Sequence, residues 1–197
     1  MTGAVGILAY GSLIANPGDE ILAVRTQVVT DLSTPFPVEY ARTSTGRGGA
    51  PTLVPFDDGG AVQSQLFIVD CSVEDATDRI FRREIDKVGS GRQYTPSDNP
   101  GPNTVIVSRI DNFLNIEVVL YTRIEPTIPD PTPATLAVLA IDSVARTDSG
   151  RDGITYLMDA INAGISTPLT DDYAAEIMRR TGTGTLEEAL ASVRGST

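Results

Sequence analysis

The chain begins with an apolar run, Val5–Ala9, that has the length of a buried β-strand. Further runs in which apolar and polar residues roughly alternate predict more strands, over residues 36–43, 51–56, 61–69, 105–110 and 114–123. Asp111 and Asn112 are the expected turn between the last two. Residues 19–29 fit either a short helix or an irregular segment. The first two thirds of the chain therefore predict about six strands.

One stretch in this region has helical spacing instead, over residues 73–85. Ser72 precedes it as a good N-cap, and Asp75 adds a negative charge in the first turn. Five residues at helical spacing share one face: Val73, Ala76, Ile80, Phe81 and Glu84. The pattern thus predicts a helix that carries a glutamate on its apolar stripe.

A proline-rich connector at residues 126–133 separates this region from a helical one. Helices are expected over 134–146, 153–163, 171–180 and 186–193. Because few strands alternate with helices, a doubly wound parallel sheet is not expected. The sequence predicts an α+β fold with a small, mixed, barrel-like sheet, a packed helix and a helical C-terminal region. We expect a single domain over 1–197, with the sheet core in 1–125 and the helical tail, 134–197, packed on it.

Composition and charge narrow the classes of partner. The 197 residues include 15 Lys and Arg against 26 Asp and Glu, a net charge of −11. Such a charge repels a phosphate backbone, which argues against nucleic acid. No apolar run has the length of a membrane span, and no basic region precedes the first apolar run as in a secretory signal. Cys71 is the single cysteine, which fits a reducing compartment, so a cytoplasmic location without membrane partners is expected.

The chain contains no histidine. This excludes Ser-His-Asp and Cys-His catalysis and removes the commonest metal ligand. There is also no cysteine cluster for zinc. We therefore expect no metal and no cofactor, and any acid–base chemistry has to come from carboxylates, Lys, Tyr or the backbone.

The first strand ends abruptly in Tyr10-Gly11-Ser12-Leu13. Gly11 allows the backbone to approach a ligand closely, and Ser12 supplies a hydroxyl as well as an N–H. A row of backbone N–H groups at this place could hold a carboxylate or a polarised carbonyl oxygen. The alternative is an ordinary turn after an N-terminal strand.

Glu84 is the second candidate. It lies on the apolar stripe, close to the C-terminus of its helix. Burial and the helix dipole both favour the protonated form of a carboxylate in such a place, and a general acid–base needs a carboxylate that can be protonated. The alternative is a surface ion pair with Arg79, Arg83 or Lys87. The glycine-rich loop at 44–50 is interpreted as a hairpin connection and not as a phosphate site, because no Gly-Lys-Ser/Thr pattern follows it.

The turn sequence Ala-Tyr-Gly-Ser-Leu-Ile, followed by Pro17-Gly18, resembles the signature of the γ-glutamyl cyclotransferase-like superfamily, and most closely its ChaC-like branch. Three further stretches are similar to elements of that branch: Arg-Arg-Glu at 82–84 with Tyr94-x-Pro96, Arg42 and Ser44 with Arg47-Gly48, and Gly150-Arg151 with Tyr156-Leu157. The sequence departs from the pattern in a longer insert, 86–93, and in lacking an aromatic residue after Ile14.

The resemblance implies the superfamily fold and cyclisation of a γ-glutamyl amide to 5-oxoproline, with release of an amine. It implies that Glu84 is the catalytic acid–base and that Tyr94 lines the pocket. Tyr10, Gly11, Ser12 and Leu13 would bind the substrate, Leu13 through its main chain alone. Two alternatives stay open: a small-molecule or partner-binding module without turnover, and removal of a γ-glutamyl group in a biosynthetic pathway.

Overall fold

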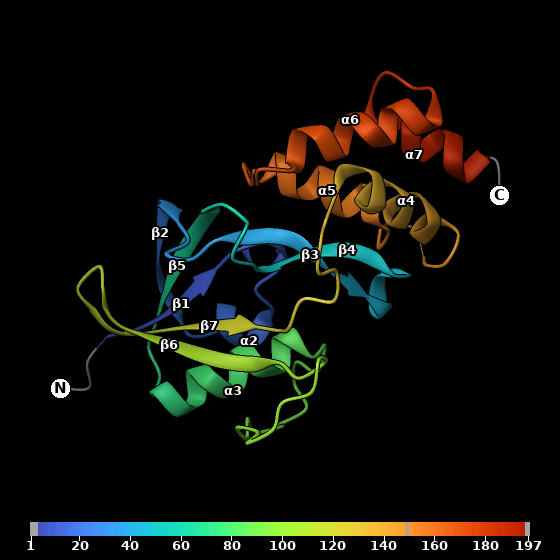
Figure 1. Ribbon diagram of the computed structural model, residues 1–197. Coiled ribbons are helices and arrows are strands. Elements are labelled where there is room, and N and C mark those ends of the chain that lie inside the picture. Colours follow the sequence, from blue (N-terminus) through green and yellow to red (C-terminus); the bar gives the residue numbers. More distant parts are fainter. Residues whose placement is uncertain (1–3, 149, 196–197) are drawn as a thin grey trace. The chain divides into compact units, whose positions relative to one another are not determined.

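The computed structural model describes residues 4–148 and 150–195, which divide into two compact units (Figure 1). The first unit comprises Met1–Thr34 and Gln63–Glu125, and the second comprises Pro35–Val62 and Pro126–Thr197. The fold is α+β with a helical C-terminal region, as predicted. The first unit differs from the expected sheet core of 1–125 in one respect: residues 35–62 lie in the second unit, with the C-terminal helices. The expectation of a single domain stays a prediction.

The first unit is built on a five-stranded sheet in the order β2-β5-β1-β7-β6. Its strands are β1 (Val5–Ala9), β2 (Arg25–Ser33), β5 (Gln63–Val69), β6 (Ile106–Phe113) and β7 (Ile116–Arg123). The central β1 pairs antiparallel with β5 and parallel with β7, so the sheet is mixed, as predicted. It is not closed into a barrel, because β2 and β6 are its two edges.

Three helices belong to this unit: the one-turn helices α1 (Ser12–Ala15) and α2 (Asp19–Leu22), and α3 (Val73–Glu84). The α3 helix packs against β1, β6 and β7 (Figure 1). Ser72 caps it as predicted, since its Oγ accepts the Asp75 N–H at 3.1 Å. The core of the unit is formed by Val5, Ile7, Ala9, Leu13, Ile21, Phe67, Val69, Ala76, Ile80, Val118 and Leu120. Apolar faces of α1, α2 and α3 are thus buried together with β1.

The second unit combines a hairpin, β3 (Val38–Ser44) with β4 (Ala50–Pro55), and four helices. The helices are α4 (Pro133–Val144), α5 (Gly153–Asn162), α6 (Thr170–Thr181) and α7 (Leu186–Gly195), which agree with the four predicted ones. Strand β4 packs against α4 and α5. Among the described residues, no helix has both the length and the apolar character that crossing a bilayer requires.

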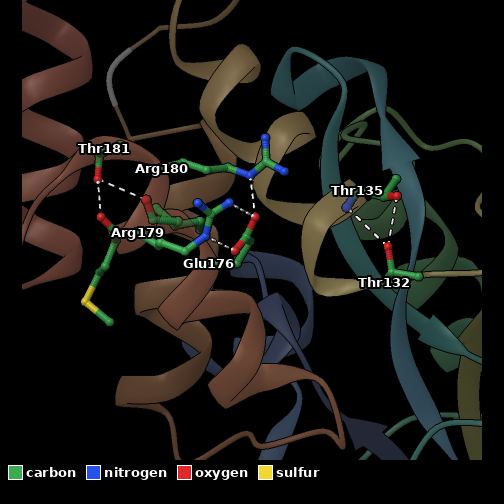
Figure 2. A network of polar contacts seen from close by, with 8 residues as sticks. Thr132, Thr135, Glu176, Arg179, Arg180 and Thr181 are labelled. Atoms are coloured by element: carbon green, nitrogen blue, oxygen red, sulfur yellow. Dashed lines mark hydrogen bonds and ion pairs between the residues drawn. The ribbon is translucent and has the colours of Figure 1, made fainter.

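Polar side chains fix the ends of these helices (Figure 2). Thr132 caps α4, because its Oγ1 accepts the Thr135 N–H at 3.3 Å. Near the end of α6, Arg179 and Arg180 both donate to the Glu176 carboxylate at 2.7 Å. The hydrogen bond from Arg179, together with that from Arg180, lowers the pKa of Glu176 to about 2. These two arginines are therefore engaged with a carboxylate on their own helix.

Two local predictions are revised, the first of them only in part. Residues 19–29, expected as a short helix or an irregular segment, begin with the short helix α2 but continue into the start of strand β2. The turn expected at Asp111 and Asn112 lies instead at Leu114 and Asn115, with Phe113 opposite Ile116. Both turn residues have positive φ, 53° and 64°, which is the two-residue turn that suits the twist of a hairpin.

Close approach of α4 and α5 gives a first testable prediction. A Cβ on Gly153 would lie 2.7 Å from the Ala140 Cα and 3.1 Å from the Ala50 Cβ. We expect Gly153→Ala to destabilise the protein by about 1–3 kcal/mol, because α5 has to move away from α4. Gly195→Ala is the matched control, since it adds the same methyl at a helical position with nothing within 4 Å. Chemical denaturation measures both, and equal stabilities would contradict the close contact.

Candidate active site

The turn after β1 places two backbone donors side by side. Gly11 has a φ of 57°, and Ser12 begins the one-turn helix α1. The Leu13 N–H donates to the Tyr10 carbonyl at 3.3 Å, whereas within the described part of the chain the N–H groups of Gly11 and Ser12 donate to no protein acceptor. The Leu13 side chain is buried in the core. Gly11 and Ser12 are consequently the donors that this turn offers to a ligand.

Glu84 is the last residue of α3, and its carboxylate has two neighbours. Its Oε2 accepts from Thr122 Oγ1 on β7 at 3.4 Å and lies 3.5 Å from Arg83 Nη1. The side chain keeps 32% of its surface exposed, more than its place on the apolar stripe predicts, because α3 ends at this residue. The carboxylate is therefore accessible to a ligand and held by neighbouring polar groups.

A polar network joins this carboxylate to the turn after β1. Arg83 Nη2 donates to Ser12 Oγ at 3.1 Å, and Arg83 Nε donates to the Asn16 carbonyl at 2.9 Å. On the other side of Glu84, the Thr122 carbonyl accepts from the Tyr10 hydroxyl at 2.9 Å. The acid at the end of α3 and the Tyr10–Ser12 turn are thus connected twice, once through Arg83 and once through Thr122.

Tyr94 has a different set of contacts. Its ring stacks edge-on against Phe81 with the centroids 5.3 Å apart, and its hydroxyl accepts the Val107 N–H at 3.2 Å. Its own N–H donates to Asp78 Oδ1 at 2.7 Å. These contacts fasten the segment after α3 to that helix and to β6. The expected role of Tyr94 in lining a pocket stays a prediction.

A second ion pair supports the geometry of the first unit. Arg82 Nε donates to Glu20 Oε2 at 2.7 Å, and Arg82 Nη1 donates to the Arg92 carbonyl at 2.7 Å. Glu20 Oε1 also accepts the Gly89 N–H at 2.6 Å. Burial raises the pKa of Glu20, but the hydrogen bonds from Arg82 and the Gly89 N–H outweigh it, so the pKa is lowered. Arg82, which lies off the apolar stripe of α3, is buried because it holds the insert at 86–93 against α2.

Sequence reasoning missed two members of the network. Thr122 lies in a strand whose pattern gives no sign of chemistry, and Arg83 was considered only as an ion-pair partner of Glu84, a contact that the structure confirms. The third similar element, Arg42 with Ser44 and Arg47-Gly48, belongs to the second unit. The resemblance implies that this element lies near the site, and that stays a prediction.

The described residues hold no group of three or more Cys, Asp or Glu side chains placed to bind a metal ion. Comparison of the sequence with models of known families gives no match, and comparison with curated proteins gives none either. The functional argument therefore rests on the arrangement of Glu84, Arg83, Thr122 and the Tyr10–Ser12 turn, together with the motifs of the sequence. Chemically, it combines one accessible carboxylate with a neighbouring pair of backbone donors.

Proposed function

We propose that the protein is a γ-glutamyl cyclotransferase-type enzyme that converts a γ-glutamyl amide or peptide into 5-oxoproline and a free amine. The observation that carries the proposal is the double connection of the Glu84 carboxylate to the Tyr10–Ser12 turn, through Arg83 and through Thr122. The sequence resemblance to the ChaC-like branch supports it independently, because it selects the same glutamate and the same turn.

The reaction is an intramolecular acyl transfer. The α-amine nitrogen of the substrate attacks its own γ-carbonyl carbon, a new C–N bond closes the ring, and the bond to the leaving nitrogen breaks. Holding the substrate in the conformation in which these atoms meet contributes on the order of 7 kcal/mol or more in favourable cases. The N–H groups of Gly11 and Ser12 would stabilise the developing oxyanion, at roughly 3 kcal/mol for a well-placed donor.

Glu84 would move the proton. It takes one from the α-ammonium group, which makes the amine nucleophilic, and returns it to the leaving nitrogen as the amide bond breaks. The second proton that the ring nitrogen loses passes to the released amine, which leaves as an ammonium ion. The Thr122 hydroxyl and the Arg83 guanidinium both contact Glu84 Oε2 and would together orient the carboxylate. The cycle leaves Glu84 in its starting state, and the proposed chemistry uses only groups of this chain.

The test is direct. The purified protein is incubated with glutathione and with a panel of γ-glutamyl amines, and 5-oxoproline release is measured by chromatography. Turnover of at least one substrate is the expected result. No 5-oxoproline from any γ-glutamyl compound would overturn the proposed activity.

Two departures from the family pattern favour the binding-module alternative: the longer insert at 86–93 and the lack of an aromatic residue after Ile14. Calorimetry with a non-cleavable γ-glutamyl ligand, run beside the 5-oxoproline assay on the cleavable panel, separates the two functions. Binding of the ligand without 5-oxoproline in the assay would identify a module, and binding together with 5-oxoproline an enzyme. For the location, we propose the cytoplasm, which fits the single cysteine, Cys71.

Arg83 offers a prediction about positioning. Replacing it in Arg83→Met removes both bonds from α3 to the α1 turn, at Ser12 Oγ and the Asn16 carbonyl. We expect kcat/KM to fall by about 10- to 100-fold, because small misplacements of a site are costly, whereas the free energy of unfolding falls by only about 1–3 kcal/mol. Arg92→Met is the matched control, since that exposed side chain lies in the loop after α3. Equal losses of kcat/KM in both variants would contradict a positioning role.

A further inference from the structure

The glycine-rich loop between β3 and β4 brings three arginines of the second unit together. The loop is a 3₁₀ turn, Thr45–Arg47, followed by Gly48 and Gly49. A Cβ on Gly46 would lie 3.6 Å from Arg151 Nη2, and one on Gly49 would lie 4.0 Å from Arg146 Nη1. Both guanidinium groups therefore lie close to the loop backbone, at the glycines that flank Arg47 and Gly48 in the sequence.

The loop cannot carry side chains at its two last glycines. Gly48 and Gly49 have φ of 65° and 86°, and a Cβ on Gly48 would lie 2.9 Å from the Ser143 carbonyl at the end of α4. Their N–H groups fold the turn by donating to the carbonyls of Thr45 and Ser44. The backbone is thereby fixed close to α4, and the arginines approach it without hindrance from side chains.

Arg47 is fixed in a different way. Its guanidinium lies 4.7 Å from the ring centroid of Tyr156 on α5, a cation–π contact. When the face of a guanidinium stacks on an aromatic ring, its N–H donors stay at the edge of the plane, where they can bind a carboxylate or phosphate with two hydrogen bonds. Arg47 is thus held against α5 and is less exposed than Arg146 and Arg151.

We propose that Arg47, Arg146 and Arg151, around the 44–49 loop, bind the oxyanion group of a small molecule, either a phosphate or a carboxylate. Three cations gathered at one loop are unusual in a chain with 15 basic and 26 acidic residues. The net charge of −11 disfavours a polyanion, so a small ligand is the class that fits. Asp142 competes for one of these arginines, because its Oδ2 lies 3.3 Å from Arg146 Nη2. Both side chains are half exposed, so that pair is weak and can be displaced.

The proposal does not depend on the cyclotransferase activity and is tested by binding. Sodium phosphate and sodium malonate are titrated separately into the full chain by calorimetry, at an ionic strength held constant with sodium chloride. The wild type is expected to bind at least one of the two, which also distinguishes phosphate from carboxylate. The double variant Arg146→Gln/Arg151→Gln is expected to bind about tenfold more weakly or worse.

Arg179→Gln/Arg180→Gln is the control, because it removes the same charge from arginines that are engaged with Glu176 (Figure 2). It should bind like the wild type. Thermal unfolding gives a second readout, since a ligand that binds the native state raises the Tm in wild type and control but not in the double variant. No binding of either anion, or equal weakening in both double variants, would overturn the proposal and leave the arginines as packing groups of the loop.

Discussion

Glu84→Gln is expected to lower the rate of 5-oxoproline formation by about 100- to 10,000-fold, the usual contribution of a general acid–base. Gln has the shape of Glu and can still accept from Thr122, but it cannot take a proton from the substrate amine. The side chain is one-third exposed, so the fold should tolerate the change with little loss of stability. Product release by the wild type and the variant on the best substrate of the panel measures the effect.

Glu74→Gln is the matched control for this experiment. Glu74 lies in the first turn of the same helix, so the substitution is chemically identical but is made at the opposite end of α3. We expect it to keep the wild-type rate. Full activity in Glu84→Gln would show that another group carries the proton, and equal loss in both variants would point to the helix as a whole instead of its last residue.

The individual elements could largely be predicted from the sequence, because strong local signals define them. The apolar run Val5–Ala9 and the capped helix after Ser72 are examples. Strand β2 escaped prediction for a physical reason. Its pairing with β5 shifts register between Arg25 and Gln27 and again between Val29 and Leu32, and Asp31 has a φ of 58°. Such bulges interrupt the alternation of buried and exposed positions on which strand prediction rests.

Only those parts of the candidate site that form short motifs in the sequence could be predicted. Glu84 and the Tyr10–Leu13 turn each stand out by sequence, but the network between them joins residues that are far apart in the chain. Arg83 meets Ser12 over 71 positions, and the Tyr10 hydroxyl meets the Thr122 carbonyl over 112. Which of many threonines and arginines completes such a site is decided by strand order, with β7 beside β1, and single-residue patterns contain no information on that order.

The sequence could not predict, for the same reason, that residues 35–62 belong to the unit of the C-terminal helices. Their alternation correctly indicates a hairpin, but an amphipathic hairpin does not reveal which apolar surface covers it. In the structure, β4 packs against α4 and α5, which lie more than 75 positions further along the chain. One residue of this hairpin, Glu39, shows how firmly it is attached to the helical region.

Glu39 on β3 is 1% exposed, and its carboxylate accepts hydrogen bonds from its own strand and from the segment before α6. Its Oε1 accepts from the Tyr40 N–H at 2.8 Å and from Thr167 Oγ1 at 2.7 Å, and its Oε2 accepts from the Leu169 N–H at 3.3 Å. Thr167 and Leu169 form the segment that leads into α6. A single buried carboxylate therefore ties the hairpin to the start of a helix about 130 positions away.

Glu39→Ala is expected to destabilise the protein by about 3–5 kcal/mol, because it removes the carboxylate that accepts from the buried Tyr40 N–H, the Thr167 hydroxyl and the part-buried Leu169 N–H. The Thr167 hydroxyl keeps Thr170 Oγ1 as a partner at 3.1 Å, so the Tyr40 N–H bears most of the loss. For a chain of this length, such a loss lowers the Tm by roughly 10 °C. Glu187→Ala on the exposed side of α7 makes the same substitution without removing a buried acceptor, and it should stay within about 0.5 kcal/mol of the wild type. Denaturant unfolding followed by circular dichroism measures both variants. If Glu39→Ala proved as stable as Glu187→Ala, the hairpin would have to be held by its apolar contacts alone, and the buried carboxylate would not contribute to the attachment.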